Sequence, residues 1–346
     1  SSSLSLISAP SRRYRLISTL HLHSSYNHPL LRQWQSQRCL LEKSQFIFPL
    51  FITEEKDVLH PISALPDNYH IGVNRLVEYL KPLVAKGLRS VLLFGVPAEH
   101  TCKDGKGTSA DDASGPVIQA VQVLRKSFPQ LYVICDVCLC AYTSHGHCGI
   151  MNHEMRLDND ASVERLTQVA LSYAQAGCHM VAPSDMMDGR IGSMKQALLA
   201  QKRDDVALMS YAAKFASVFY GPFRSACSTS LKGNRKDYQL PPASEGLAKQ
   251  ALIRDSNEGA DVIMVKPGMP YLDIVRLARE VVSQPISVYQ VSGEYAMIYH
   301  AAANGGLDLQ QAVLESMICM RRAGADMIIT YFTPKLLDWL DHLPSE

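Results

Sequence analysis

Short, nearly continuous runs of apolar residues, rich in Val, Ile and Phe, recur along the whole chain. Runs of this kind are typical of parallel strands that are buried on both faces. Between them, apolar residues recur at spacings of three and four positions, which is typical of amphipathic helices. The predicted strands cover residues 46–52, 90–96, 131–137, 179–185, 206–212, 261–267, 286–292 and 326–332.

Glycines mark the ends of several predicted helices. Gly87, Gly177, Gly259 and Gly324 each come shortly before a predicted strand, where a left-handed helix cap is expected. Eight alternations of strand and helix predict an α/β fold of the (β/α)8 TIM-barrel type. A doubly wound open sheet is the alternative, but no G-x-G-x-x-G motif follows the first strand.

The carboxyl ends of the predicted strands carry polar and reactive side chains, at the end of the barrel where TIM-barrel enzymes place their chemistry. These side chains belong to Asp136, Ser184, Asp185, Lys214, Lys266, Ser292 and Tyr331. An amine within an apolar run, or beside a second cation, loses its proton easily and can form a Schiff base. The alternative for Lys214 and Lys266 is an ion-paired or snorkelling side chain.

Four of the nine cysteines lie close together, and we expect three of them to hold a metal ion. Cys138, Cys140 and Cys148 would occupy three corners of a tetrahedron and leave the fourth open, as in catalytic zinc sites. Cys135, His145 or His147 could replace one of these ligands, and the alternative is a set of buried thiols beside a polar loop.

The odd number of cysteines disfavours a disulfide framework and favours reduced thiols. The scattered thiols are predicted to be small buried hydrophobes: Cys39, Cys102, Cys178, Cys227 and Cys319.

A long basic stretch, residues 219–242, separates the strands that end in the two lysines. Its cations could clamp substrate carboxylates beneath a lid, or could simply form a solvated loop: Arg224, Lys232, Arg235 and Lys236. In residues 184–190, Ser184, Asp185 and Asp188 could face an ammonium group or carry protons, and Asp188 could instead cap a helix.

Composition narrows the possible functions. The chain has 346 residues, of which 47% are hydrophobic and 19% charged, so it has enough apolar side chains for a large core and global disorder is excluded. Basic and acidic residues nearly balance, 34 against 33, so the net charge gives no indication of binding to nucleic acid or an anionic membrane. No apolar run approaches the roughly 18–20 residues of a spanning helix.

The N-terminus has a composition of its own. Residues 1–41 contain five arginines, many serines and no Asp or Glu. We therefore expect residues 1–20 to be either a targeting-like segment or a flexible extension.

Together, these segments resemble the 5-aminolevulinate dehydratase (porphobilinogen synthase) family in its zinc-dependent, animal-type form. The resemblance runs from about residue 21 to the C-terminus, and its motifs are CDVCLCAYTSHGHCG, VAPSDMMDGR, SYAAKFAS, FYGPFR, MVKPGMPYLD, VYQVSGEYAM and IITYFTP. It implies an N-terminal arm over residues 21–45 and one catalytic barrel over residues 46–346. The family is a lyase of heme (porphyrin) biosynthesis that condenses two 5-aminolevulinate molecules to porphobilinogen with loss of two waters.

The resemblance also implies a role for each site residue. Lys266 forms the Schiff base with the first substrate and Lys214 with the second, while zinc binds Cys138, Cys140 and Cys148. The remaining substrate contacts it implies are Arg224, Arg235 and Gln239 on the second carboxylate, Ser292 and Tyr331 on the first carboxylate, Asp136 and Ser184 on the first amino group, and Tyr220 and Tyr289 along the pocket wall.

The resemblance implies a homo-octamer assembled through the arm, with no nucleic-acid or membrane partner. We expect a cytoplasmic location, with organelle targeting by residues 1–20 as the alternative. Two other functions are kept as hypotheses: a Schiff-base (class I) aldolase-type lyase on the same barrel, and a catalytically inactive zinc-binding relative.

Overall fold

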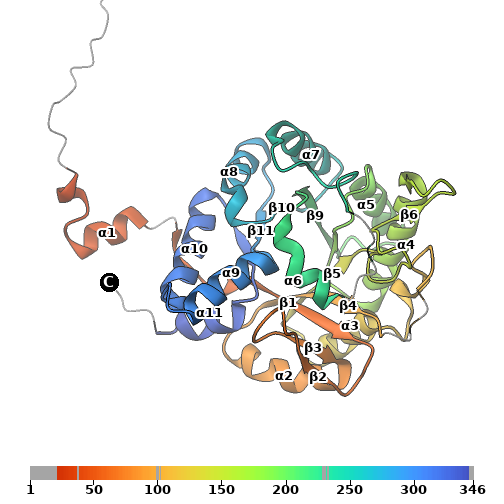
Figure 1. Cartoon of the computed structure of the whole chain (residues 1–346), viewed down its shortest axis with the longest axis horizontal. Helices are drawn as coiled ribbons and strands as arrows, with labels where there is room; N and C mark the ends of the chain where they lie inside the picture. The colour runs from red at the N-terminus through yellow and green to blue at the C-terminus, as the bar shows by residue number, and fades with distance from the viewer. Residues whose placement is uncertain are drawn as a thin grey trace, which may run out of the picture. The chain divides into compact units, whose positions relative to one another are not determined.

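Eight parallel strands close into a barrel in the computed structural model, which describes residues 22–36, 39–98, 101, 103–227, 231 and 234–342 (Figure 1). The barrel strands are β1 (Phe46–Thr53), β4 (Ser90–Val96), β5 (Tyr132–Val137), β8 (Met180–Pro183), β9 (Ala207–Lys214), β10 (Val262–Lys266), β11 (Ile286–Tyr289) and β12 (Met327–Ile329). They pair in chain order, and β12 returns to β1 with Phe46 opposite Ile328. The (β/α)8 prediction and all eight predicted strands are confirmed.

Helices surround the ring of strands (Figure 1). They are α2 (Val73–Ala85), α3 (Pro116–Ser127), α4 (Asn159–Ala176), α5 (Arg190–Ala200), α7 (Glu245–Asn257), α8 (Leu272–Val281), α9 (Ser292–Ala303), α10 (Leu309–Ala323) and α11 (Thr333–Trp339). The four glycines expected at helix ends have φ between 98° and 131°, a region that glycine adopts without a steric penalty. Side-chain oxygens cap the amino ends of α4, α7 and α10: Asp158, Ser244 and Asp308.

The strands are covered on both faces. Every residue of β1 is buried, and the interiors of β4, β9 and β10 are almost as completely enclosed. This explains why the strands read as continuous apolar runs rather than as alternating patterns.

Shorter elements decorate the barrel. A hairpin of β2 (Leu59–Pro61) and β3 (Tyr69–Gly72) adds to β1, and β6 (Ile150–Met151) pairs with β7 (Leu157–Asp158). After β9, the turn η5 (Val218–Tyr220) leads into the short helix α6 (Gly221–Ala226), which crosses in front of the strands in Figure 1.

The described residues before residue 39 form a unit separate from the barrel, with a turn η1 (His23–Ser25) and a helix α1 (Pro29–Ser36). The predicted arm, residues 21–45, overlaps this unit, and its boundary stays a prediction. The targeting-like segment, residues 1–20, lies outside the described residues.

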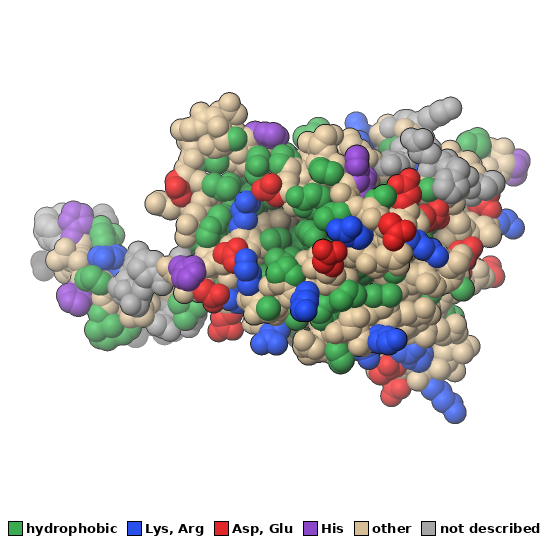
Figure 2. All heavy atoms as spheres, turned by 90° about the horizontal axis from the view of Figure 1, so that it is seen from below, with side chains coloured by type: hydrophobic (Ala, Val, Ile, Leu, Met, Phe, Trp, Pro, Cys, Tyr) green, Lys and Arg blue, Asp and Glu red, His purple; other side chains and the backbone are tan. Residues whose placement is uncertain are grey.

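On the face shown in Figure 2, acidic and basic side chains are interspersed, so neither sign of charge predominates there. Among the described residues, no helix is both long and apolar enough to cross a membrane.

Candidate active site

Lys214 and Lys266 are the last residues of neighbouring strands and are register partners in the β9–β10 ladder. Both residues are 5% exposed, and the charge of Lys214 contributes to lowering the pKa of Lys266. The pairing confirms the expectation that the two lysines lie together at the carboxyl end of the barrel. Two amines in one enclosed space disfavour two positive charges.

Lys266 is surrounded by aromatic rings. Its Nζ lies 4.1 Å from the centre of the Tyr289 ring, and the rings of Tyr211, Phe223 and Tyr220 lie 5.1–5.4 Å away. Burial, aided by the charge of Lys214, lowers the pKa of Lys266 to about 7. The ring faces attract the charged amine by ~0.5–2 kcal/mol. This is less than the ~5 kcal/mol in favour of the neutral amine that corresponds to a fall in pKa from 10.5 to about 7. About half of the Lys266 amine is therefore neutral near pH 7.

Lys214 has a polar neighbour instead. Its Nζ donates a hydrogen bond to the backbone carbonyl of Ser184, which directly follows β8. The Tyr211 ring lies 5.6 Å from the Lys214 amine, so this ring is shared by both lysines.

Tyr211 is a site residue that the sequence patterns did not reveal. In a regular strand, residues three apart point to opposite faces, so Tyr211 and Lys214 should not meet. The register between β9 and β10 shifts along this stretch, with Ser210 opposite Ile263 but Ala213 opposite Val265. This bulge inserts one residue into β9 and brings both side chains to the same side.

Asp136 is the carboxylate whose charge acts most strongly on Lys266. Burial raises the pKa of Asp136 to about 6, although the charges of Lys214 and Lys266 oppose the rise. Its Oδ1 is buried without a hydrogen-bond partner among the described residues, although a buried carboxylate oxygen normally has one. Asp136 lines a narrow cavity of about 20 Å³ with Cys138, Cys140 and Phe223.

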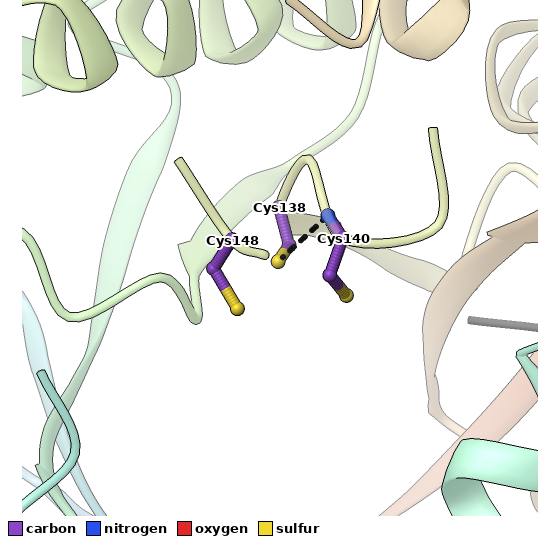
Figure 3. A group of neighbouring side chains, drawn as sticks. All are labelled: Cys138, Cys140 and Cys148. Atoms are coloured by element: carbon purple, nitrogen blue, oxygen red, sulfur yellow. Dashed lines mark hydrogen bonds between the residues drawn. The ribbon is translucent and has the colours of Figure 1, made fainter. Parts of the chain in front are cut away.

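The three predicted metal ligands converge in the structure. The sulfurs of Cys138, Cys140 and Cys148 all lie within 4.8 Å of one another and point into a common space (Figure 3). The amide of Cys140 also donates to the Cys138 sulfur at 3.5 Å. Hydrogen bonds from the other two thiols, helped by the charge of Arg235, lower the pKa of Cys148, so the cluster favours a thiolate.

The substitute ligands named from the sequence do not join this trio. Cys135 interacts with Cys178, and the Nδ1 of His147 lies 3.1 Å from the Tyr238 hydroxyl. His145 lies 3.5 Å from the Gly105 carbonyl. Within the part of the chain that the structure describes, Cys138, Cys140 and Cys148 are the one such group, and no cysteine forms a disulfide.

Cys227, predicted from the sequence to be a small buried hydrophobe, also lies at the candidate site. It is buried as expected, but it lines the same narrow cavity as Asp136, Cys138 and Cys140. Its position in the sequence gave no sign of this, because the packing of α6 decides which cavity Cys227 lines.

Three buried nitrogens, all from residues implied to bind the second carboxylate, have no acceptor in the described structure. They are Nε of Arg224, Nε of Arg235 and Nε2 of Gln239. Arg235 is anchored by a 3.1 Å bond to the Gly146 carbonyl, and burial together with the charge of Arg235 lowers the pKa of Arg224. Buried donors are normally satisfied, so these groups suit an anionic ligand.

The residues implied to bind the first carboxylate contact residues whose rings surround Lys266. The hydroxyls of Tyr289 and Tyr331 are 3.0 Å apart, and Ser292 accepts a 3.0 Å bond from the Phe223 amide of α6. Tyr220 donates to the Phe215 carbonyl at 2.7 Å. These contacts attach α6 to the carboxyl ends of β9 and β11.

Glu294 is a second residue that the sequence patterns did not reveal. Its fully buried carboxylate accepts backbone bonds from Gly268 at 3.1 Å, Met269 at 2.5 Å and Val291 at 2.7 Å. It thereby ties the loop after Lys266 to the loop before Ser292. Burial raises the pKa of Glu294 to about 7.

Two of the acidic candidates face away from the lysines. Asp185 pairs with Arg190, and Asp188 pairs with Arg254 on the outside of the barrel; the cap position of α5 is occupied by Gly189, so Asp188 is not its cap. Among the loop cations, Lys236 is exposed beside an outer pocket, and Lys232 lies outside the described residues.

Fold and site together define a class: a (β/α)8-barrel enzyme with paired buried lysines and three thiols able to hold a metal ion at one mouth. The sequence matches the family model described as delta-aminolevulinic acid dehydratase over residues 19–339, and the chain belongs to this family.

Individual relatives agree with the family match. The chain is 55% identical over 322 residues to the delta-aminolevulinic acid dehydratase of Macaca fascicularis, covering 92% of this chain and 97% of the relative. It is 50% identical to that of Dictyostelium discoideum, covering 92% and 96%. The resemblance to this family is thus confirmed, and with it the assignment of the chain as an enzyme of this family; the zinc-dependent, animal-type form stays a prediction.

A solved structure supports the same conclusion. Delta-aminolevulinic acid dehydratase (porphobilinogen synthase) from Toxoplasma gondii, in complex with the reaction product porphobilinogen, superposes with a TM-score of 0.90 at 33% identity. The match covers 93% of this chain and 91% of that one.

Proposed function

We propose that this chain condenses two molecules of 5-aminolevulinate to porphobilinogen through Schiff bases on Lys266 and Lys214, with zinc bound by Cys138, Cys140 and Cys148. The observation that carries this proposal is the register pairing of two buried lysines, one of them with a pKa lowered to about 7. A neutral amine is the form that attacks a ketone.

The first substrate binds at Lys266. Its ketone condenses with the Nζ and expels one water, and the resulting iminium withdraws electrons from the neighbouring carbons. Ser292 and Tyr331 hold its carboxylate. Asp136 and Ser184 orient its amino group, and a carboxyl with a pKa of about 6 can take up or release a proton there.

The second substrate binds at Lys214, which expels the second water in the same way. Its carboxylate supplies the acceptor that Arg224, Arg235 and Gln239 lack. Carbon–carbon and carbon–nitrogen bond formation between the two substrates then displaces both lysines, so the overall loss is two waters. Tyr220 and Tyr289 line the pocket in which this occurs.

The thiol trio fits zinc. Zinc–sulfur bonds of ~2.3 Å in a tetrahedron require sulfurs about 3.8 Å apart, and soft thiolates favour zinc over magnesium. Sulfurs that already lie within 4.8 Å of one another need little movement. When bound, zinc would polarise or position the second substrate.

The aldolase hypothesis is less well supported, since it explains one strand-end lysine but neither the second lysine nor the thiols. The inactive-relative hypothesis conflicts with the presence of every proposed substrate contact. For the protein in the cell, we propose a homo-octamer assembled through residues 21–45, located in the cytoplasm, with no nucleic-acid or membrane partner.

The test is a product assay with metal removal and replacement. Purified, zinc-loaded protein should convert 5-aminolevulinate to porphobilinogen, lose this activity when treated with a strong chelator, and regain it with zinc but not with magnesium. Recovery with magnesium alone would contradict the proposed metal, and absence of product from folded, zinc-loaded protein would contradict the proposed function.

A further inference from the structure

Arg190, at the start of α5, carries a guanidinium that is fully buried just outside the barrel wall. It is 0% exposed, as are its two acidic partners, Asp185 and Asp255. The Arg190 Nη2 lies 3.2 Å from the Asp255 carboxylate, and its Nε lies 3.7 Å from that of Asp185. None of these three residues belongs to the proposed substrate contacts.

The guanidinium also holds two pieces of backbone. Its Nη1 donates to the Met187 carbonyl at 3.2 Å, and its Nη2 donates to the Tyr211 carbonyl at 3.3 Å. Asp185 completes the first contact by accepting the Met187 amide at 2.8 Å. Arg190 therefore joins the turn after β8 to β9 at its bulge.

Both pieces of backbone adjoin Lys214. The turn after β8 begins with Ser184, whose carbonyl accepts the hydrogen bond from the Lys214 amine. Tyr211 precedes Lys214 in β9, and its ring lies beside the same amine. One side chain thus fixes the acceptor of Lys214 and the strand that carries Lys214.

The network continues outward from Arg190 to the surface. Asp255 of α7 also accepts from Ser210 of β9 and lies 2.7 Å from Arg254, which pairs with exposed Asp188. A buried ion pair of this kind gives little net stability, because desolvation offsets the attraction. Its value here is geometric, since only a planar fork of donors can bond several fixed acceptors at once.

We propose that Arg190 is a positioning residue for Lys214, acting through the Ser184 carbonyl and the β9 backbone. Among the described residues, this network meets the surroundings of Lys266 only at the Tyr211 ring, and the loop after Lys266 is held separately by Glu294. Loss of the guanidinium fork should therefore impair the step at Lys214 and leave the chemistry of Lys266 intact. The inference rests on the proposed assignment of one substrate to each lysine.

The test is the variant Arg190→Lys, which keeps the charge and loses the fork. Two quantities are measured on folded, zinc-loaded protein: kcat and KM for porphobilinogen formation, and the yield of borohydride-trapped 5-aminolevulinate on Lys266 by peptide mass spectrometry. We expect kcat to fall about 10- to 100-fold, because a displacement of about 1 Å is enough for such a loss. The Lys266 adduct should stay within about twofold of wild type, since the rings of Tyr289, Phe223 and Tyr220 lie outside the network.

The matched control is Arg279→Lys. Arg279 of α8 also pairs with an aspartate, Asp326, and with the Gly324 carbonyl, but at the amino end of β12 and so at the opposite end of the barrel. This pair is partly exposed, so its loss should leave kcat within about twofold of wild type. If Arg190→Lys does not fold, Asp255→Asn makes a related test, because it removes the charge partner 3.2 Å from the Nη2 of the fork while keeping the size of the side chain, and the same fall in kcat is expected.

The outcomes separate the two proposals. An unchanged kcat, or a fall in kcat accompanied by an equal fall in the Lys266 adduct, would overturn the positioning role. Absence of any Lys266 adduct in the wild-type protein would instead overturn the Schiff-base proposal, and that measurement is made first.

Discussion

The two lysines of the site end neighbouring strands as register partners, yet their surroundings differ. Lys266 is enclosed by the rings of Tyr289, Tyr211, Phe223 and Tyr220. Lys214 donates to the Ser184 carbonyl, whose turn is fixed from outside the barrel by the buried charges around Arg190. One amine is held mainly by apolar packing and the other by a polar network.

The difference shows how one fold can give two lysines different tasks. Repulsion between two amines is mutual, so it cannot by itself decide which one loses a proton. The apolar enclosure lowers the pKa of Lys266 and prepares it to react first. The polar support of Lys214 instead fixes the direction of its amine, which suits a partner that must meet an already bound substrate.

The largest expected effect comes from removing each amine in turn. Lys266→Ala and Lys214→Ala should each lower kcat by at least about three orders of magnitude, because a covalent nucleophile cannot be replaced by binding alone. The trapped adducts distinguish the two: Lys214→Ala should keep the Lys266 adduct. Retention of most activity by either variant would remove that lysine from the mechanism.

Removal of the metal should affect the two lysines differently, because zinc is proposed to serve the second substrate. Cys148→Ala should lower activity about 100-fold or more, given that loss of even an outer partner of a metal ligand costs 10–100-fold. The Lys266 adduct should persist in this variant. Measured zinc content should fall in parallel with activity, and full activity in a zinc-free variant would contradict the proposed metal site.

The carboxylate contacts provide a graded test. Arg235→Met should raise KM about 10- to 100-fold, since a hydrogen bond to a charged group contributes about 1.5–3 kcal/mol. Ser292→Ala, on the Lys266 side, should raise KM about 10-fold, the lower end of the same range, because a neutral hydroxyl rather than a guanidinium donates to the carboxylate. Steady-state kinetics check both values, and a larger effect of Ser292→Ala would reverse the assignment of the stronger clamp to the second substrate.

The pH dependence of adduct formation isolates Lys266. With a pKa of about 7, the neutral fraction of the amine rises about tenfold between pH 6 and pH 8, whereas an amine with an ordinary pKa would remain almost wholly protonated throughout. The rate of borohydride trapping on Lys266 should therefore rise about tenfold over this interval and level off above it. A rate that keeps rising tenfold per pH unit to pH 9 would show an unperturbed lysine.

Much of this molecule could be predicted from sequence because its strands are buried on both faces. Continuous apolar runs such as residues 90–96 leave little ambiguity, and a barrel places their carboxyl ends together. The paired lysines and the thiol trio follow from that geometry.

What the sequence could not predict depends on register and packing. Tyr211 reaches the site through a β-bulge, which no spacing rule anticipates. Arg190 reads as an ordinary residue after Gly189, and Glu294 as a polar residue of the first turn of α9; only their burial reveals what they hold. The sequence made Asp185 and Asp188 candidates for the site, yet both turn away from the lysines.

The most direct test of the central claim is to map where the substrate becomes covalently attached. Zinc-loaded protein is incubated with 5-aminolevulinate, reduced with borohydride and digested, and each lysine-containing peptide is analysed by mass spectrometry. The account predicts a substrate adduct on Lys266, formed before any on Lys214. Adducts on neither lysine, in folded protein that holds zinc, would contradict it.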